Sequence, residues 1–400
     1  MTAARWTVLF LMSLAHALGS LSVLAVAPLA PFLLDGLRLS RVEIGLFLPA
    51  VYLGGVLMSL PAGSLTERYG VGRPLVAGLV LIAVAVAATA CVRIVPLLLA
   101  FLVIAGFGFS ILNPTTGRAI YDWFPARERG LAMGVKQAGL TLGGIVSALL
   151  LPPIASALGW QAAVLLGAAL SLLAALVVGA AYREAPGHGA LATPGRPPLT
   201  ELGPLLRRSG VLVVLGCGLG LGMVQSSMLA YLVLYARDTF ALSSVDAARL
   251  LALAHVGGAI GRLGWGVVSD KFFAGRRRPG LALNALVAAS GLVVFALGGE
   301  LSPFWAGAVA FVAGLGAFGW VGLFFALMAE IGGTRMAGLM TGLGVIFAWG
   351  GVLLGPPLFG ALVEATDSYR FGWFGLSAMA VAVAAILPCL HPLVQRSHDT

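Results

Sequence analysis

The chain has 400 residues, of which 60% are hydrophobic and only 10% are charged. Soluble proteins usually contain about 45 to 50% apolar and about 25% charged residues, so this composition excludes an ordinary soluble domain and indicates a membrane protein. The net charge of +9 is explained by orientation in the bilayer and contact with anionic lipid, without a nucleic-acid partner.

Twelve apolar stretches are long enough to cross a bilayer, which takes roughly 20 mainly apolar residues in a helix. We predict spans at residues 6–34, 42–66, 75–92, 95–121, 130–157, 160–181, 211–236, 246–270, 281–299, 302–330, 337–363 and 370–391. The alternating pattern of a membrane barrel is absent from the sequence, so helices must satisfy the backbone polar groups. The first stretch resembles a secretory signal but runs too long, and we expect it to be retained.

One Gly-, Pro- and Arg-rich segment interrupts the apolar pattern at residues 182–208. It predicts an N-terminal six-helix bundle at 1–181, a cytoplasmic linker at 182–208 and a C-terminal six-helix bundle at 209–400. Because each half has an even number of spans, both enter the membrane from the same side and form parallel repeats.

A shared motif shows that the halves are copies of each other. Residues 63–73 read Gly-Ser-Leu-Thr-Glu-Arg-Tyr-Gly-Val-Gly-Arg, and residues 266–271 read Gly-Val-Val-Ser-Asp-Lys. The offset of 203 residues, 266 minus 63, also aligns residues 54–55 with 257–258 and Pro153 with Pro356. The loop residues matched in this way are Gly63 with Gly266, Glu67 with Asp270, and Arg68 with Lys271.

The basic residues are distributed unevenly between the two sides of the membrane. Of 24 in total, 16 lie at the termini or in loops after even-numbered spans, and two lie inside spans. The remaining six lie on the other side: Arg38, Arg41, Arg93, Arg237, Arg249 and Arg370. The positive-inside rule therefore predicts that both termini are cytoplasmic.

Twelve spans, a central loop and the Gly-x-x-x-(Asp/Glu)-Arg-x-Gly-x-Arg loop resemble the major facilitator superfamily over nearly the whole chain. Residues 113–129, Asn-Pro-Thr-Thr-Gly-Arg-Ala-Ile-Tyr-Asp-Trp-Phe-Pro-Ala-Arg-Glu-Arg, resemble the junction of spans 4 and 5 in its organic-anion porters. The stretch Arg262-Leu-Gly-Trp-Gly is similar to the span 8 motif of its monocarboxylate and oxalate porters. The resemblance implies an all-α fold of two six-helix bundles and secondary transport by alternating access.

Two departures from that family argue against proton coupling by its usual route. The arginine and acidic residue that proton-coupled members carry in span 4 are missing, since residues 102–109 read Leu-Val-Ile-Ala-Gly-Phe-Gly-Phe. Gly258 stands where monocarboxylate-type members commonly carry an aspartate, one turn before the span 8 arginine.

The matched loops imply a pair of gates. By resemblance, Glu67 caps the positive end of span 11 when the carrier is closed to the cytoplasm, and Asp270 does the same for span 5. Gly63 leaves room for a neighbouring helix, and Arg73 with Asp122 forms a supporting pair. The alternative is a basic loop that serves topology alone, but topology does not require the matched acids.

All 15 acidic residues lie at span ends or in loops, whereas Lys136 and Arg262 lie inside spans 5 and 8. Such a charge at the centre of a membrane helix costs about 2.5 to 3.5 kcal/mol on translocon scales. We hypothesise that the substrate, a small organic anion, is held between Lys136 and Arg262, because arginine donates two parallel hydrogen bonds to a carboxylate. By resemblance, spans 5 and 8 approach each other across the central cavity. The alternatives are snorkelling of Lys136 and a bond from Arg262 to Asp270 or to backbone near the cytoplasmic edge.

Further polar and aromatic residues complete this candidate site, although ordinary packing also explains each of them. The two histidines are candidates for ligand contact or for carrying a proton, and the amides and aromatic rings are candidates for polar contacts and cavity walls. They are His16, His255, Asn113, Gln137, Gln225, Tyr52, Trp320 and Trp349.

We therefore predict a secondary transporter for a small carboxylate in the inner (plasma) membrane, acting as a monomer by proton symport or anion exchange. The alternatives are an efflux transporter for neutral or anionic drugs or metabolites, and a non-transporting scaffold or sensor. A scaffold would not need the duplicated acids and buried charges. The sequence has no phosphate-binding loop, metal-ligand cluster or soluble domain, so we expect no enzyme activity, metal or cofactor. The expected partners are the anionic substrate, protons in the case of symport, and membrane lipids.

Overall fold

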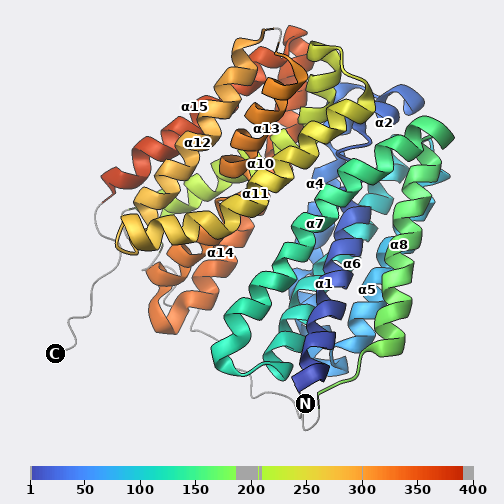
Figure 1. Ribbon diagram of the computed structural model, residues 1–400, viewed down its shortest axis with the longest axis vertical. Coiled ribbons are helices and arrows are strands. Elements are labelled where there is room, and N and C mark those ends of the chain that lie inside the picture. Colours follow the sequence, from blue (N-terminus) through green and yellow to red (C-terminus); the bar gives the residue numbers. More distant parts are fainter. Residues whose placement is uncertain (1, 186–205, 207–209, 300, 391–400) are drawn as a thin grey trace. The chain divides into compact units, whose positions relative to one another are not determined.

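The computed structural model describes residues 2–185, 206, 210–299 and 301–390, so most of the predicted linker at 182–208 lies outside the described residues. The helices in this part of the chain are shown in Figure 1. They are α1 (Thr2–Leu24), α2 (Ala30–Leu37), α3 (Arg41–Gly45), α4 (Phe47–Tyr69), α5 (Gly72–Ala90), α6 (Val95–Trp123), α7 (Ala126–Leu158), α8 (Trp160–Ala181), α10 (Val211–Phe240), α11 (Ser244–Phe272), α12 (Arg277–Leu297), α13 (Pro303–Ala317), α14 (Val321–Thr366) and α15 (Tyr369–Cys389).

Twelve helical stretches of the described residues are long and apolar enough to cross a membrane, as predicted. They follow the predicted spans in order, and the sixth, Trp160–Ala181, has the predicted bounds. The prediction of an all-α integral membrane protein with twelve transmembrane helices is therefore confirmed.

The first and tenth spans differ from their predicted outlines. Helix α1 ends at Leu24, turns follow, and α2 begins at Ala30. Pro28 explains the interruption, because proline donates no backbone hydrogen bond and disfavours helix in the residue before it. The tenth span is interrupted between α13 and α14 at residues 318–320, and a positive φ at Gly333 separates it from the eleventh.

The chain divides into two compact units. Unit 1 comprises Met1–Ala192 and Ala230–Ala252, and unit 2 comprises Thr193–Leu229 and Leu253–Thr400. Helices α10 and α11 each contribute to both units, because the end of α10 and the start of α11 belong to unit 1. The predicted bundle boundaries at residues 181 and 209 remain a prediction.

Within unit 1, α1 packs against α6, α7 and α8, while α5 packs against α6 and α8 and α4 packs against α6. Within unit 2, α12 packs against α13, α14 and α15. The core of unit 2 contains Trp265, Leu281 and Phe324, all buried. Each unit thus buries its own apolar faces.

The glycines matched by the internal repeat make equivalent contacts in the two units. A Cβ at Gly54 of α4 would lie 2.0 Å from the carbonyl oxygen of Val103 in α6. A Cβ at Gly257 of α11 would lie 2.2 Å from the carbonyl oxygen of Phe311 in α13. Glycine at both positions therefore lets the helix backbones touch, as small residues commonly do in membranes.

We expect Gly257→Ala to destabilise the protein by about 1 to 3 kcal/mol, because its methyl group would force α11 away from backbone atoms. Gly264→Ala in the same helix is the matched control, since a Cβ there would meet no described atom within 4 Å. Thermal unfolding of the purified protein measures both effects. An equal melting temperature for the two variants would contradict the packing account.

Candidate functional site

Lys136 lies inside α7 and is only 3% exposed. Its Nζ donates a hydrogen bond of 3.3 Å to Oδ1 of Asn113 in α6. Among the described residues, no carboxylate forms an ion pair with it. The side chain therefore turns inward to a neighbouring amide and does not reach the surface as the snorkelling alternative requires.

Asn113 joins this lysine to His16 of α1. The same Oδ1 lies 3.3 Å from Nε2 of His16, and the other ring nitrogen lies 3.3 Å from Oγ1 of Thr116. His16 and Thr116 are fully buried, whereas Asn113 is exposed and Gln137 is half-buried. The predicted residues Lys136, Asn113 and His16 thus form one polar cluster, and its accessible group is the amide of Asn113.

Close packing of α1 on α7 brings this cluster together. A Cβ at Gly139, one turn after Lys136, would lie 2.5 Å from the carbonyl oxygen of Ser13 and 3.3 Å from Cβ of His16. In α6, Pro114 removes a backbone donor directly after Asn113. The local sequence therefore places a charged, an aromatic and an amide side chain against one another.

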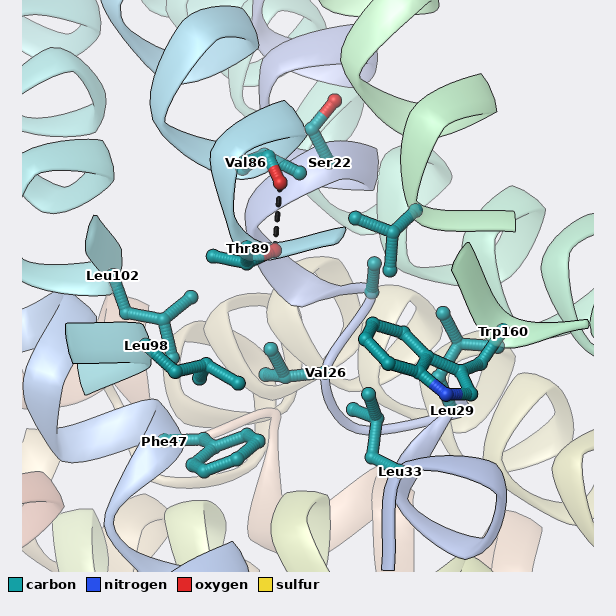
Figure 2. Close-up of a pocket in the computed structure, with 12 residues that line it drawn as sticks. Ser22, Val26, Leu29, Leu33, Phe47, Val86, Thr89, Leu98, Leu102 and Trp160 are labelled. Carbon is teal, nitrogen blue, oxygen red and sulfur yellow. Dashed lines mark hydrogen bonds between the residues drawn. The ribbon is translucent and has the colours of Figure 1, made fainter. Parts of the chain in front are cut away.

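A separate cavity in unit 1 is too small for an organic substrate. It has a volume of about 20 Å³ and an apolar lining that includes Phe47, Leu33 and Trp160. Figure 2 shows these side chains around the break between α1 and α2, with Thr89 turned to the carbonyl of Val86, to which it donates at 2.6 Å. Such a space holds at most about one water molecule.

Arg262 lies in α11 of unit 2 and is half-buried. Its Nε donates to the carbonyl oxygen of Phe318, 3.1 Å away, at the end of α13. A cation is favourable at the C-terminal end of a helix. This bond matches the structural alternative of a contact with backbone, and it uses one of five guanidinium N–H donors.

Three other predicted site residues of unit 2 lie at the break between α13 and α14: His255, Trp320 and Gln225. The ring of buried His255 lies 5.2 Å from the ring of Phe318, centroid to centroid. Trp320 is buried and donates from Nε1 to Oε1 of Gln225 at 2.9 Å. Trp349 is half-buried. In unit 1, Tyr52 of α4 is also half-buried.

Gly258 has no room for the aspartate that the family resemblance would place there. A Cβ at this position would lie 2.5 Å from Cβ of Phe318. The side chain of Phe318 occupies the space of the missing carboxylate. The departure seen in the sequence therefore has a packing reason.

The charged residues predicted to form the first gating loop are accessible, and they lie in the last turn of α4 and the first turn of α5. Glu67, Arg68 and Arg73 are exposed, and the guanidinium of Arg68 lies 5.2 Å from the ring centroid of Tyr69. A Cβ at Gly63 would meet no described atom within 4 Å. The capping roles predicted for Glu67 and Asp270 and the close approach at Gly63 remain predictions.

Asp122 and Asp270 both bind arginines of their own unit. Asp122 accepts two hydrogen bonds from Nε of Arg118, at 2.8 and 2.9 Å. Arg277 of α12 bridges Asp270 at 2.6 Å and Glu330 at 3.0 Å.

The remaining members of the predicted gate in the second half, Lys271 and Gly266, make few contacts. Lys271 is exposed, and a Cβ at Gly266 would meet no described atom within 4 Å. The predicted Arg73–Asp122 pair remains a prediction.

Sequence reasoning missed an ionic cluster in unit 1, at the membrane edge opposite the predicted gate residues Glu67 and Arg73. Arg237 near the end of α10 binds Asp35 of α2 at 2.8 Å and Asp238 at 2.9 Å. Arg41 binds Asp238 at 3.3 Å, and the hydroxyl of Tyr231 donates to the carbonyl oxygen of Arg41 at 2.6 Å. Nearly 200 residues separate the partners, so only charges of opposite sign in loops on one side hinted at it.

Twelve spans, a glycine-packed internal repeat and two cations inside spans, one buried and one half-buried, are typical of a multi-pass membrane transporter. A family profile described as the Major Facilitator Superfamily matches residues 12–356, and the chain belongs to this superfamily. The family prediction is confirmed, and its members are transporters, in agreement with the expectation of no enzyme activity.

Several relatives have names that specify anions. The chain is 25% identical to a hexuronate transporter of Bacillus subtilis, covering 98% of this chain and 96% of that protein. It is 24% identical to a probable sulfoacetate transporter of Cupriavidus necator, covering 96% and 92%. A 4-hydroxybenzoate transporter of Pseudomonas aeruginosa is 30% identical over 44% of this chain and 39% of that protein.

Solved structures agree with the fold. A bacterial homologue of the human lysosomal transporter Spinster, in an inward-facing and unoccupied conformation, has a TM-score of 0.76 at 18% identity, covering 97% of this chain and 95% of that one. A D-xylose–proton symporter has a TM-score of 0.77 at 18% identity, covering 97% and 98%.

We expect Lys136→Met to raise the melting temperature of the protein without added substrate. The change keeps the length of the side chain and removes a buried charge, which costs about 2.5 to 3.5 kcal/mol at mid-membrane on translocon scales. Thermal unfolding of the two purified proteins measures this. A large loss of stability would show that the lysine charge is needed for folding.

Proposed function

We propose that the protein carries a small organic anion with a carboxylate group, and that Lys136 binds that group. The observation that carries this proposal is a buried ammonium whose protein partner is a neutral amide. A charge in such a place needs an opposite charge to offset its desolvation. A carboxylate substrate supplies it, and Asn113 and Gln137 offer hydrogen bonds to the remainder of the ligand.

The named relatives support the anionic class. Hexuronate, sulfoacetate and 4-hydroxybenzoate differ in size and ring structure but share a carboxylate. Recognition of the carboxylate by a cation suits all three compounds.

Arg262 is a second proposed contact for the anion, in unit 2. Its planar guanidinium is the group that suits a carboxylate in the fork geometry, and its half-buried side chain lies inside the eighth span. The role of Arg262 is tested by its own variant, independently of Lys136.

We further propose alternating access, driven by proton symport or by anion exchange. The Arg237 cluster supports a gate at the membrane edge opposite the predicted cytoplasmic side. Helix α10 starts in unit 2 and ends in unit 1, so a shift of α10 against α2 would strain the pair of Arg237 with Asp35. Pairs this exposed are worth about 1 kcal/mol or less, so they can open and close readily.

The placement in the cell is proposed from the charge distribution. Sixteen of 24 basic residues lie on the side of the termini, which supports cytoplasmic termini in an inner (plasma) membrane. We also propose that one copy of the chain is the transporting unit, since each unit has its own core.

Thermal stabilisation by a ligand panel tests the proposed substrate class, because a ligand that binds only the folded state raises the melting temperature. The panel contains hexuronates, sulfoacetate, aromatic acids and cationic drugs. We expect a shift with acids in the wild type and none in Lys136→Gln or Arg262→Gln. Arg127→Gln is the control, because that side chain is 84% exposed. A shift with cationic or neutral compounds that persists in both variants would overturn the carboxylate assignment in favour of efflux.

The histidines provide a test of proton symport. If transport is proton-linked through the protein, the double substitution His16→Gln with His255→Gln should flatten the pH dependence of uptake between about pH 5 and 8, where imidazoles change charge. Uptake into proteoliposomes measures this. An unchanged pH profile would exclude proton transfer through these histidines. The remaining mechanisms would be transport of the protonated substrate and anion exchange.

Substitution of Arg237 tests the gate. Arg237→Gln should change the transport rate severalfold, because the ionic contact between α10 and Asp35 of α2 disappears. Arg249→Gln is the matched control, since Arg249 pairs with Asp246 of its own helix. Equal rates in the wild type and both variants would exclude Arg237 from gating.

A further inference from the structure

A groove runs between α5 and α8 at the membrane edge of unit 1, apart from the Lys136 cluster on α1, α6 and α7. It has a volume of about 690 Å³. Figure 1 shows α5 beside α8, and the two helices pack together. Gly72 at the start of α5 and Tyr182 directly after the end of α8 lie together at one end of the groove, and the lining continues along α5 to Val80.

The part of the groove along the two spans is apolar. Its lining includes Val76, Val80 and Val178, together with Gly179. A Cβ at Gly179 would meet only Val76, at 3.6 Å. The missing side chain therefore leaves a shallow channel of the kind that a hydrocarbon chain fills.

The part of the groove at the membrane edge is basic and aromatic. Arg73 and Arg183 are exposed, and Arg183 donates to the carbonyl oxygen of Tyr182 at 3.2 Å. No described residue forms an ion pair with Arg73. Tyr69 adds a ring that is 44% exposed. Aromatic and basic side chains at the end of a span are typical of contact with lipid headgroups.

One carboxylate also lines the groove, but its contacts fix it to the protein. Oε1 of Glu184 accepts hydrogen bonds from the backbone N–H groups of Val71 and Gly72, at 2.9 and 2.8 Å. These are donors at the start of α5, where negative charge is favourable. Its Oε2 accepts from the hydroxyl of Tyr182 at 3.4 Å. Burial raises the pKa of Tyr182, so this phenol stays protonated and remains a donor.

We propose that this groove binds one anionic glycerophospholipid, with an acyl chain along Val76, Val80 and Gly179 and the phosphate at Arg73 and Arg183. Two guanidinium groups and one carboxylate line this end of the groove, and the carboxylate is held by the start of α5 and by a phenol. The excess positive charge favours an anionic over a zwitterionic headgroup. Basic pockets between transmembrane helices are suited to anionic lipid headgroups.

The headgroup also has a structural consequence. Glu184 ties the start of the central linker to the loop between α4 and α5, and Arg73 and Arg183 flank this tie. A lipid phosphate bound to both arginines would join the same two segments a second time. The lipid thus links the start of α5, directly after the helix that carries Glu67, to the residues that follow α8.

Native mass spectrometry of the purified full-length protein tests the site. The probes are phosphatidylglycerol and phosphatidylethanolamine with identical acyl chains. We expect the wild type to retain one phosphatidylglycerol and little phosphatidylethanolamine. The double variant Arg73→Gln with Arg183→Gln should bind phosphatidylglycerol roughly tenfold or more weakly, because each basic group attracts the anionic lipid.

Two further variants separate charge from shape. Gly179→Phe should also abolish retention, because its ring fills the apolar channel while both arginines remain. Arg127→Gln with Arg276→Gln removes the same charge outside the groove and should bind as the wild type does. Size-exclusion profiles and helical content show which variants fold. If Gly179→Phe does not fold, the double arginine variant alone tests the proposal.

Three outcomes would overturn the proposal. One is equal retention of phosphatidylglycerol by the wild type and the groove variants. Another is equal retention of the two lipids by the wild type. The third is displacement of the lipid by inorganic phosphate at millimolar concentration, which would assign the arginines to a free anion.

Discussion

The positive charge of Lys136 is buried, and no carboxylate of the described residues pairs with it. The account depends on this one constraint. Water is absent from the interior of a membrane span, so an ammonium such as that of Lys136 loses its hydration and must find other partners. Asn113 supplies a dipole but no charge. In the function proposed here, an anionic substrate completes the electrostatic balance, because an unbalanced positive charge favours ligands of opposite sign.

Glycines allow the close packing of several helix pairs, including the pair of α1 and α7 beside Lys136. Gly54 and Gly257 bring equivalent helix pairs into backbone contact, and Gly139 does the same for α1 and α7. Rigid packing near the charge contrasts with the ionic contacts at the membrane edges, such as Arg237 with Asp35, which are exposed and weak. Close packing near Lys136 and weak ionic contacts at the membrane edges suit the proposed carrier, because its binding site would stay intact while its gates open and close.

The twelve spans, the duplication and the buried cations were predictable because hydropathy and charge are local properties of a sequence. Contacts between distant helices were not. Nothing in the sequence showed that Asn113 accepts from Lys136 and lies beside His16, or that Arg262 binds the carbonyl of Phe318, because that carbonyl becomes available only where α13 ends. The break in the first span followed from Pro28, a local signal that the apolar run concealed.

The most direct measurement compares binding of an acid with binding of its primary amide, using the acid that stabilises the protein most. The two ligands have the same shape and differ in charge. The account predicts that the wild type prefers the acid by about tenfold or more, the range that a charged hydrogen bond provides, and that Lys136→Gln loses this preference. Undiminished preference in Lys136→Gln would show that another group binds the carboxylate.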